Sequence, residues 1–412
     1  MHYKEAKMPA IVGFPTIVEE ALTQYGDLFA NEPERRHFAE YLTGLLVAER
    51  KSVRGINSEF AVTTDQSCLN RFLTGVKWDA KGLNERRLKE LQHDPATRYS
   101  AQGVIAIDNT LIDHEGKLME DAGWFWDHAD QRYLIAHDYL IANYVCTSGK
   151  HYPLEFRRFR KRETWDEKDG PFKDHTDLFI ELVDWVIAHD IPGDFSFDCY
   201  FTHEKILNHI HSKGRTYVGD LKFNRNVIFR GRKMKASEVA ASIPPDVRKP
   251  VERSGERQYY FTKTIRIPGV DHPVRIVILW KHKEDAQPIK MMVTSRTRWE
   301  TTRILRVYSK RWTGTETFHR DGKQQLGMGD CQLRNGQGQT RHMYLVFLAY
   351  SRIMAHLRQD CAKEWALKRL TTVGEACRAV LRETLGQTIE WSIQRASEGW
   401  TPLQIKTFLA IP

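Results

Sequence analysis

The first hundred residues alternate apolar and polar side chains with the period of an α-helix. The clearest apolar stripe, at spacings of i, i+3, i+4, i+7 and i+8, consists of Phe38, Tyr41, Leu42, Leu45 and Leu46. A second helix is predicted over about 52–60, and Thr63 and Gln66 form a capping-box pair that predicts the start of a third helix. We therefore expect a helical N-terminal region.

The pattern changes near residue 99, where sheet-forming segments begin. Residues Val104 to Ile107 form a continuous apolar run, which is typical of a strand that is buried on both faces. Further strands are predicted over 137–146, 152–159, 195–199 and 216–220, and helices over 174–189 and 202–212. Three strands followed by alternating helices and strands predict an α/β sheet with mixed pairing.

The rest of the chain changes character once more. Residues 226–294 are rich in β-branched and aromatic side chains and are interrupted by Pro and Gly, which predicts a β-rich insertion. From Trp299 onward the pattern is mostly helical. We therefore expect an α/β middle that is interrupted by a β-rich segment and followed by a helical end.

The charge of the chain favours an anionic partner. Among 412 residues, 62 are Lys or Arg and 53 are Asp or Glu, which gives a net charge of +9. Basic residues gather over 157–162 and 222–235. Each cluster fits contact with a DNA backbone and an ordinary solvated basic face equally well.

Other features of the composition exclude several classes of protein. No stretch approaches the roughly 18 apolar residues that a membrane span needs, and residues 1–7 lack the apolar run of a secretory leader. The six cysteines form no close pair and no Cys-x-x-Cys motif, so we expect reduced thiols and not disulfides or structural zinc. These patterns predict a soluble cytoplasmic protein with no membrane partner.

The predicted N-terminal helices have a spacing that is used to contact DNA. Two short helices joined by a tight turn are typical of a helix-turn-helix. In that arrangement Gln66, Asn70 and Arg71 would face the DNA. An ordinary helical bundle explains the same pattern equally well, because short helix pairs are common.

Two aspartates follow apolar strands. Asp108 ends the run Ile105-Ala106-Ile107, and Asp198 ends the run Phe195-Ser196-Phe197. Ligands of α/β sheets bind at the carboxyl ends of parallel strands, and carboxylate oxygens are the ligands that hard divalent cations prefer. Each aspartate alone is also an ordinary residue of a turn or helix cap. Together they predict a shared metal site.

A third acid lies in the helical region that follows. We expect a helix over about 315–326, on which Glu316, Arg320 and Lys323 share one face at i, i+4 and i+7. A solvated salt-bridge face is the ordinary explanation of such a stripe. The neighbouring Phe318 indicates that one side of this helix packs against another part of the protein. A charged stripe beside that packed side favours a site that binds metal and phosphate together.

The residues around Glu316 resemble a family signature. The DDE transposases of bacterial insertion sequences include a branch marked by Tyr, two residues, Arg, three residues, Glu, six residues and Lys. This chain is similar: Tyr308, two residues, Arg311, four residues, Glu316, six residues and Lys323. The gap before Glu316 is one residue longer, and we expect its glycine to absorb the extra residue in a loop before the helix. Restoring the gap would place Thr315 at the acid position, so Glu316 is the better choice.

The resemblance implies a ribonuclease-H-like core and a two-metal reaction. It implies that Asp108 bridges two Mg²⁺ or Mn²⁺ ions per active site, while Asp198 and Glu316 each hold one. It also implies that Tyr308, Arg311 and Lys323 grip phosphates near the cleavage site; Arg suits bidentate contact and Lys serves as a point charge. The reaction implied is cleavage of DNA at the ends of a mobile element and joining of the freed 3′-OH to target DNA.

The resemblance also implies partners and a place in the cell. The partner is double-stranded DNA, both element ends and target, and the protein is expected in the cytoplasm with the nucleoid. A homodimer is expected in the DNA complex, because two ends must be brought together. The helices from Cys361 onward are the candidate contact, although packing within the chain explains their apolar stripe equally well. That stripe consists of Ala366, Leu367, Leu370, Val373, Cys377 and Val380.

The expected fold class is α/β, with a ribonuclease-H-like mixed sheet and flanking helices. The sheet is interrupted by the β-rich insertion. The predicted parts are a helical DNA-binding domain at 1–98, the catalytic core at 99–225 and 295–360, the insertion at 226–294, and a C-terminal helical region at 361–412.

Two other functions fit part of the same pattern. One is a domesticated, non-catalytic DNA-binding protein of transposase descent, against which the three acids argue. The other is a general ribonuclease-H-like nuclease, which explains the acids but not Tyr308, Arg311 and Lys323 around them.

Overall fold

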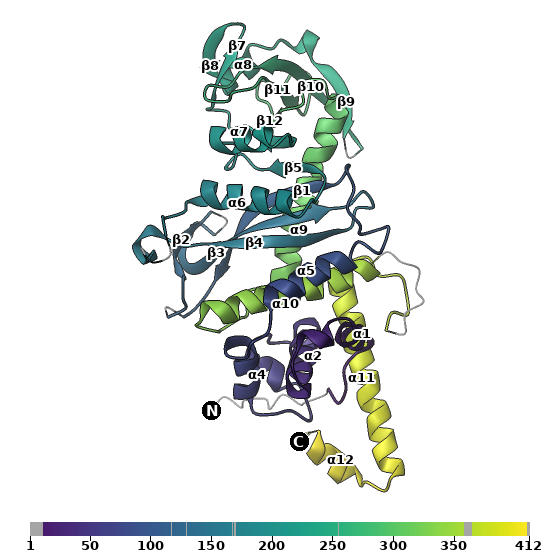
Figure 1. Ribbon diagram of the computed structural model, residues 1–412. Helices are drawn as coiled ribbons and strands as arrows, with labels where there is room; N and C mark the ends of the chain where they lie inside the picture. The colour runs from purple at the N-terminus through teal and green to yellow at the C-terminus, as the bar shows by residue number, and fades with distance from the viewer. Residues whose placement is uncertain are drawn as a thin grey trace. The chain divides into compact units, whose positions relative to one another are not determined.

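The protein combines a ten-stranded mixed sheet with helices that precede, flank and follow its strands (Figure 1). The computed structural model describes residues 11–116, 118–128, 130–166, 168, 170–253, 255–357 and 365–409. The chain divides into two compact units. The helical unit comprises Met1–Thr97, Leu111–His137 and Phe318–Pro412, and the sheet unit comprises Arg98–Thr110 and Asp138–Thr317.

Helices dominate the helical unit. They are α1 (Thr16–Tyr25), α2 (Glu32–Val47), α3 (Val53–Asn57), α4 (Gln66–Thr74), α5 (Ala80–Glu90), α10 (Gly336–His356), α11 (Val373–Ser397) and α12 (Pro402–Phe408). Asn31 caps α2 by accepting a hydrogen bond from the Glu34 amide at 3.0 Å. The apolar stripe that predicted α2 is buried along its whole length. This helix is therefore confirmed.

The start of α4 differs from the predicted capping box. Asp65 is the N-cap, and its carboxylate accepts a hydrogen bond from the Ser67 amide at 2.8 Å. The Thr63 hydroxyl instead donates to the Asn57 side chain at 3.1 Å. The prediction of Thr63 as the cap was wrong, because an aspartate directly before the helix is an equally good cap and lies closer to it.

Most strands lie in the sheet unit. Strands β1 (Val104–Asp113) and β3 (Arg132–Val145) run through both units, and β2 (Gly123–Asp127) lies in the helical unit. The strands of the sheet unit are β4 (His151–Phe159), β5 (Asp194–Phe197), β6 (Tyr217–Asp220), β7 (Asn226–Phe229), β8 (Arg232–Lys235), β9 (Lys249–Arg253), β10 (Glu256–Ile265), β11 (Val274–Trp280) and β12 (Lys290–Thr294). Its helices are α6 (His175–Ala188), α7 (Glu204–Ser212) and α8 (Ala236–Ala241).

The strands of the predicted insertion continue the central sheet. The strand order is β2-β3-β1-β5-β6-β12-β11-β10-β9, with β4 paired to β3 and with β7 and β8 in a separate hairpin. β5 pairs in parallel with β1 and β6, and β12 is antiparallel to β6. This arrangement confirms the predicted mixed α/β fold with a helical C-terminus, consistent with a ribonuclease-H-like core. The boundaries of the five predicted parts stay a prediction.

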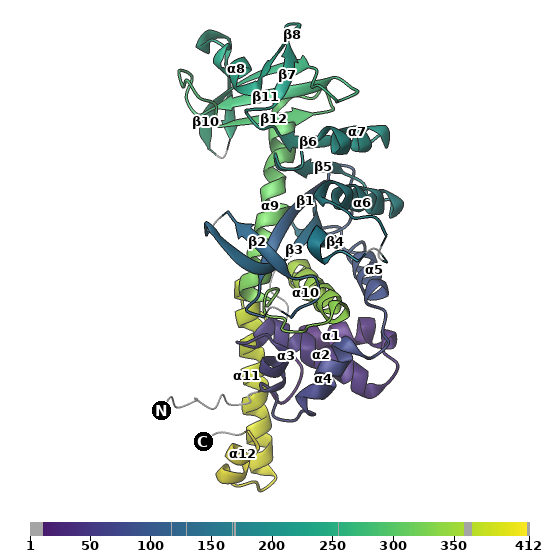
Figure 2. The same ribbon diagram turned by 90° about the vertical axis from the view of Figure 1, so that its left-hand side faces the viewer.

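Helices cover both faces of the sheet in the sheet unit. Figure 2 shows α6 and α7 on one face and α9 (Thr301–Gln325) on the other. α9 passes from the sheet unit into the helical unit. A Cβ atom at Gly314 would lie 2.6 Å from Val145 Cγ2 and 3.0 Å from Ala106 Cβ. The glycine therefore lets α9 approach β1 and β3 more closely than any other residue would allow.

Two predictions about the segments that carry Asp108 and Glu316 were wrong. β1 continues to Asp113, so Asp108 lies inside the strand and not at its end. β1 also pairs with β3, and this allows the strand to extend beyond the residues that pair with β5. The helix expected over 315–326 is the last part of α9, which is continuous through Gly314. No loop absorbs the extra residue before Glu316, because close packing of Gly314 on the sheet keeps the helix intact.

Candidate functional site

Three aspartates lie in one row across neighbouring strands of the sheet unit. The parallel register pairs Ala106 with Ser196, and two residues further along each strand lie Asp108 and Asp198. β5 pairs Phe197 with Gly219, so Asp220 takes the next place in the row. The sequence prediction named the first two aspartates and missed Asp220. Its signal was the same, because Asp220 also ends a short apolar strand.

The carboxyl group of Asp108 is the most perturbed acid of this row. Burial, then the nearby charge of Asp198, raise its pKa from an ordinary value of 3.8 to about 7. Glu316 raises this pKa further, whereas Arg311 lowers it. Asp198 and Glu316 therefore both lie close enough to Asp108 to raise its pKa. Burial also raises the pKa of Asp198, while the Tyr200 amide, which donates to its carboxylate at 2.8 Å, lowers it.

Arg311 supplies a positive charge to the row. Its Nη1 atom donates to Asp108 Oδ2 at 2.8 Å, and only 8% of its side chain is exposed. Its buried Nε atom has no hydrogen-bond partner among the residues that the structure describes. Such an unpaired donor is costly in a buried place, so it leaves this guanidinium ready to bind a further acceptor.

A second basic group lies around Asp220. Lys290 Nζ lies 3.1 Å from Asp220 Oδ2 and 3.2 Å from the Tyr308 hydroxyl, which itself donates to Asp220 at 3.3 Å. Burial lowers the pKa of Lys290, but Asp220 and Tyr308 more than reverse this and hold it above the ordinary value. Sequence reasoning missed Lys290, because a single lysine in a strand carries no signal.

The third acid, Glu316, lies five residues beyond Arg311 on α9. Its side chain is half-buried, whereas Thr315 is fully buried and donates its hydroxyl to the Arg311 carbonyl at 3.0 Å. Thr315 is thus a buried packing position of α9. This burial supports Glu316, and not the neighbouring position, as the acid of the helix.

A polar network lies beside Asp108 that the sequence did not predict. Asn109 donates its side-chain amide to Asp138 at 3.0 Å, and His175 Nε2 lies 2.7 Å from the other oxygen of Asp138. The His175 ring stacks on Phe159 with 4.0 Å between ring centroids. These residues come from β1, β3, β4 and α6, so only the folded chain brings them together. They fix the strand segment that carries Asp108.

The site can be tested for its fit to a metal ion. Within the described ranges, no three His, Cys, Asp or Glu side chains are arranged closely enough to hold one. The donor set still suits hard divalent cations, because it consists of carboxylate oxygens. The raised pKa of Asp108 and its ion pair with Arg311 both indicate that this row requires a neighbouring positive charge.

The other predicted DNA-contacting residues belong to the helical unit. On α4, Gln66 and Arg71 are exposed and Asn70 is half-buried, with its side chain accepting a hydrogen bond from Thr74. Arg320 is exposed on α9, where it pairs with Asp321; Lys323 is also exposed and lies one turn further along the helix. These positions are available to a partner, and their role in DNA contact stays a prediction.

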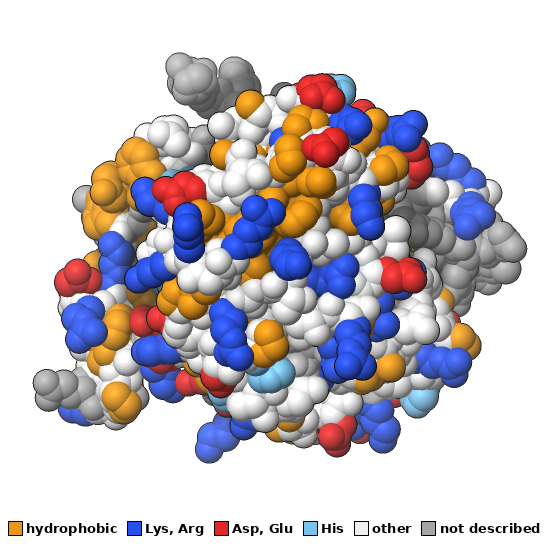
Figure 3. Space-filling model, turned by 90° about the horizontal axis from the view of Figure 1, so that it is seen from above, with side chains coloured by type: hydrophobic (Ala, Val, Ile, Leu, Met, Phe, Trp, Pro, Cys, Tyr) orange, Lys and Arg blue, Asp and Glu red, His pale blue; other side chains and the backbone are white. Residues whose placement is uncertain are grey.

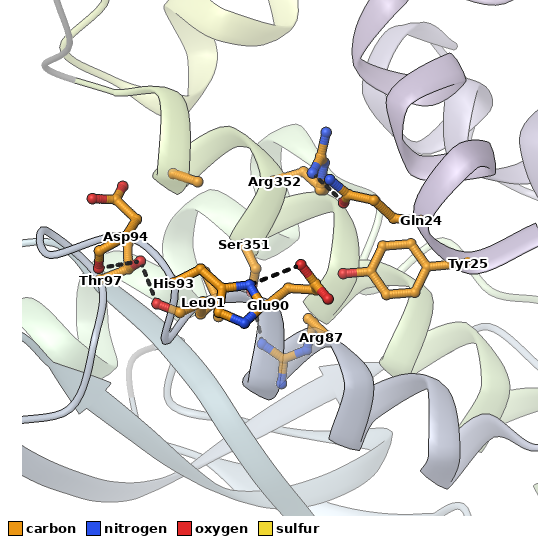
Figure 4. A pocket seen from close by; sticks show the side chains of 11 residues that line it. Gln24, Tyr25, Arg87, Glu90, Leu91, His93, Asp94, Thr97, Ser351 and Arg352 are labelled. Atoms are coloured by element: carbon orange, nitrogen blue, oxygen red, sulfur yellow. Dashed lines mark hydrogen bonds and ion pairs between the residues drawn. The ribbon is translucent and has the colours of Figure 1, made fainter.

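A cavity of 330 Å³ lies in the helical unit among α1, α5 and α10 (Figure 4). Most of its polar side chains bind one another. Arg87 donates to Ser351 at 2.7 Å, Arg352 donates to Gln24 at 2.7 Å, and His93 lies 3.4 Å from Glu90. This cavity therefore reflects the packing of the N-terminal helices on α10, and it contains none of the predicted catalytic acids.

Family comparisons agree with the geometry of the acid row. Residues 173–352 match the family model described as Transposase DDE domain, and residues 24–242 match that described as DDE superfamily endonuclease. The second match spans more than half of the chain. No curated protein matches the sequence. Among the described residues, no helix has the length and apolar character needed to span a membrane.

Proposed function

The chain belongs to the DDE superfamily of endonucleases, a group of transposase type, and on this premise we propose that it is a DNA transposase. In this proposal it binds the ends of a mobile element and cleaves the DNA backbone there. It then joins the freed 3′-OH to target DNA. Asp108, Asp198 and Glu316 are the catalytic acids.

The aspartate row carries this proposal. Asp108 is buried next to Asp198 and is affected by Glu316, an arrangement that costs the folded protein free energy at neutral pH. Clustered acids with perturbed pKa values are typical of active sites, where function maintains an arrangement that is unfavourable for stability. A single strand-end aspartate would support no such conclusion.

Divalent cations suit the carboxylate chemistry of this row, and the three acids would have to draw closer together to hold them. Asp108, Asp198 and Glu316 would hold two Mg²⁺ or Mn²⁺ ions. When bound, such cations activate the attacking oxygen and stabilise the leaving oxygen of a phosphodiester. Arg311 would then exchange Asp108 for a phosphate oxygen, for which its unpaired Nε is an additional donor.

Tyr308 and Lys290 would complete the grip on the phosphate. Both contact Asp220, which keeps them at the edge of the aspartate row. A lysine with a raised pKa stays charged at neutral pH, so it would neutralise a phosphate oxygen without a proton transfer. These residues position the strand, and the acids act on the scissile bond.

The surface of the protein supports DNA as the partner. Lys and Arg side chains are spread over the face shown in Figure 3. In the sheet unit the β7–β8 hairpin exposes Arg230, Arg232, Lys233 and Lys235. Its turn, Arg230-Gly231, has positive φ at both residues, the geometry of a tight two-residue hairpin turn. In the helical unit, α4, Arg320 and Lys323 are the proposed further contacts.

An exposed apolar stripe on α11 supports a homodimer. It consists of Leu381, Leu385, Ile389 and Ile393, which recur every four residues and are between 40% and 65% exposed. Side chains at this spacing lie on one helical face. The stripe extends beyond the one predicted from residues 366–380, where Val373, Cys377 and Val380 are instead buried within the chain. Cys361 lies outside the described residues.

The test uses a supercoiled plasmid that carries the gene with its flanking DNA. We expect nicking at the element ends in Mg²⁺ or Mn²⁺, followed by joined products. Asp108→Asn should abolish both steps, because it removes the charge at the centre of the site. Asp246→Asn, at an exposed position, is the matched control and should retain them.

Each alternative predicts a different result in that assay. Undiminished cleavage by Asp108→Asn would sink the assignment of the acids. Sequence-specific binding of the flanks without cleavage by the unaltered protein would favour a non-catalytic DNA-binding protein. Degradation of RNA–DNA hybrids without preference for particular DNA ends would favour a general nuclease.

A further inference from the structure

A second cavity in the sheet unit adjoins the aspartate row. Its volume is 440 Å³, and it is lined by Cys199, Thr202, His203, Leu221, Lys222, Asn224, Arg225, Asn226, Lys233 and Pro268. Cys199 directly follows Asp198, and Leu221 directly follows Asp220. Thr202 bridges the two strand ends, since its hydroxyl lies 3.1 Å from the Asp198 carbonyl and also contacts the Asp220 carbonyl. The cavity therefore begins where the row of acids ends.

The cavity has an excess of positive charge. Arg225 is neutralised by Glu204, whose carboxylate accepts a hydrogen bond from it at 2.7 Å. Within the part of the chain that the structure describes, neither Lys222 nor Lys233 forms an ion pair with a carboxylate. Lys222 instead lies with its Nζ 5.7 Å from the centroid of the Tyr200 ring. Two like charges beside one cavity repel each other, and an anion between them would relieve this repulsion.

The start of α7 lies at the same cavity. The N-cap of α7 is His203, which lines the cavity and whose side chain makes no capping hydrogen bond. The first backbone amides of a helix have no partner within the helix, and they carry the positive end of its dipole. The positive end of this dipole lies beside the cavity that Lys222 and Lys233 line, and positive charge of this kind suits phosphate.

We propose that this cavity binds a backbone phosphate of the DNA strand next to the scissile position. The inference deepens the proposed function and rests on it for the identity of the strand. The shared chemistry is a phosphate monoanion or diester, and free inorganic phosphate would satisfy the same donors. Cleavage acts at the acids, whereas this subsite holds the strand on the side of β6 and α7.

The test measures DNA binding without requiring cleavage. The probe is a fluorescent 20-base-pair duplex, and anisotropy gives its dissociation constant between 50 and 200 mM salt in the absence of divalent metal. Lys222→Met with Lys233→Met should lower the salt slope by about 1, the effect of one lost phosphate contact. The affinity of the unaltered protein should then fall about 3.5-fold further over this salt range than that of the variant. Lys205→Met, an exposed lysine on α7 outside the cavity, should leave the slope unchanged.

A second measurement reports on the cavity itself. Cys199 lines it and is partly exposed, so alkylation of this thiol, followed by mass spectrometry, reports whether the cavity is occupied. The duplex should slow alkylation of Cys199 in the unaltered protein and in Lys205→Met, and should slow it much less in the double variant. Equal protection in all three proteins, or equal salt slopes, would overturn the proposal.

Two further results distinguish DNA from free phosphate as the ligand, and distinguish failure of this proposal from failure of the proposed catalytic function. If inorganic phosphate at constant ionic strength protects Cys199 but duplex does not, the site binds free phosphate and the assignment to DNA is overturned. If the duplex protects Cys199 through Lys222 and Lys233 while no cleavage occurs in metal, the subsite stands and the proposed catalytic function fails.

Discussion

Replacing Asp108 by Asn should abolish cleavage and also change how the stability of the metal-free protein depends on pH. The carboxyl group is 9% exposed and lies beside Asp198, so folding raises its pKa from 3.8 to about 7. An acid with a raised pKa in the folded state binds more protons when folded than when unfolded. Its contribution to stability is therefore present at low pH and is lost as the pH rises through about 7.

The expected size follows from these two pKa values. At pH 5 the folded carboxyl group is almost entirely protonated, and at pH 8 it is almost entirely ionised. Over each pH unit in which this carboxyl group is ionised only in the unfolded state, the unfolding free energy falls by about 1.4 kcal/mol. The group therefore costs the unaltered protein about 2.5 kcal/mol of unfolding free energy between pH 5 and pH 8. Asn at the same position does not titrate, so this part of the pH dependence disappears.

The measurement is the unfolding free energy from urea titration at both pH values, without divalent metal. The comparison is a difference of differences, so titrating groups elsewhere in the chain cancel. Asp246→Asn is the control, because an exposed acid should leave the pH dependence as it is. If Asp108→Asn and Asp246→Asn show the same dependence, Asp108 is not the strained acid inferred from its burial, and the reasoning from the aspartate row is refuted.

Three further predictions follow from the same geometry. Gly314→Ala should lower the unfolding free energy by about 1–3 kcal/mol in urea titration and should impair cleavage, because its Cβ atom would overlap β1 and β3. Gly386→Ala is the control: it has open space around it, so its unfolding free energy should be unchanged or higher. Leu385→Asp should shift the DNA complex from dimer to monomer in sedimentation velocity. Leu118→Asp, at an even more exposed position elsewhere, should not; unchanged sedimentation of both variants would exclude the α11 stripe. Mg²⁺ at ten times its dissociation constant should raise the stability of the unaltered protein at pH 8 by about 1.4 kcal/mol for each ion bound, and it should leave Asp108→Asn unchanged. Equal effects on both proteins would place the metal elsewhere.

Local patterns in the sequence predicted the parts of the site that depend on one strand. Asp108 and Asp198 each follow an apolar run, and a buried strand needs such a run whatever surrounds it. The parallel register then brings them side by side just beyond the point where the pairing of β1 with β5 ends, although β1 itself continues past Asp108. Asp220 carried the same signal on a shorter strand, so it was within reach of the same reasoning.

Long-range contacts were beyond that reasoning. Asp138 and His175 lie 37 residues apart in the sequence, and nothing in the pattern around either one points to the other. Lys290 reaches Asp220 from a strand that was assigned to a separate insertion, although β12 in fact pairs with β6. Such pairings depend on the order of strands in the sheet, which hydrophobic periodicity does not specify.

The extra residue between Arg311 and Glu316 has a structural consequence because α9 is continuous. Residues four apart on a helix differ by about 40° in direction, whereas residues five apart differ by about 140°. Arg311 points at Asp108, so Glu316 approaches the row from another side of the helix. Thr315, at the shorter spacing, is fully buried and donates its hydroxyl to the Arg311 carbonyl, so an ionised acid there would be costly. We expect an incoming phosphate to offer Arg311 a partner in place of Asp108, which would free the Asp108 carboxylate to share a cation with Glu316.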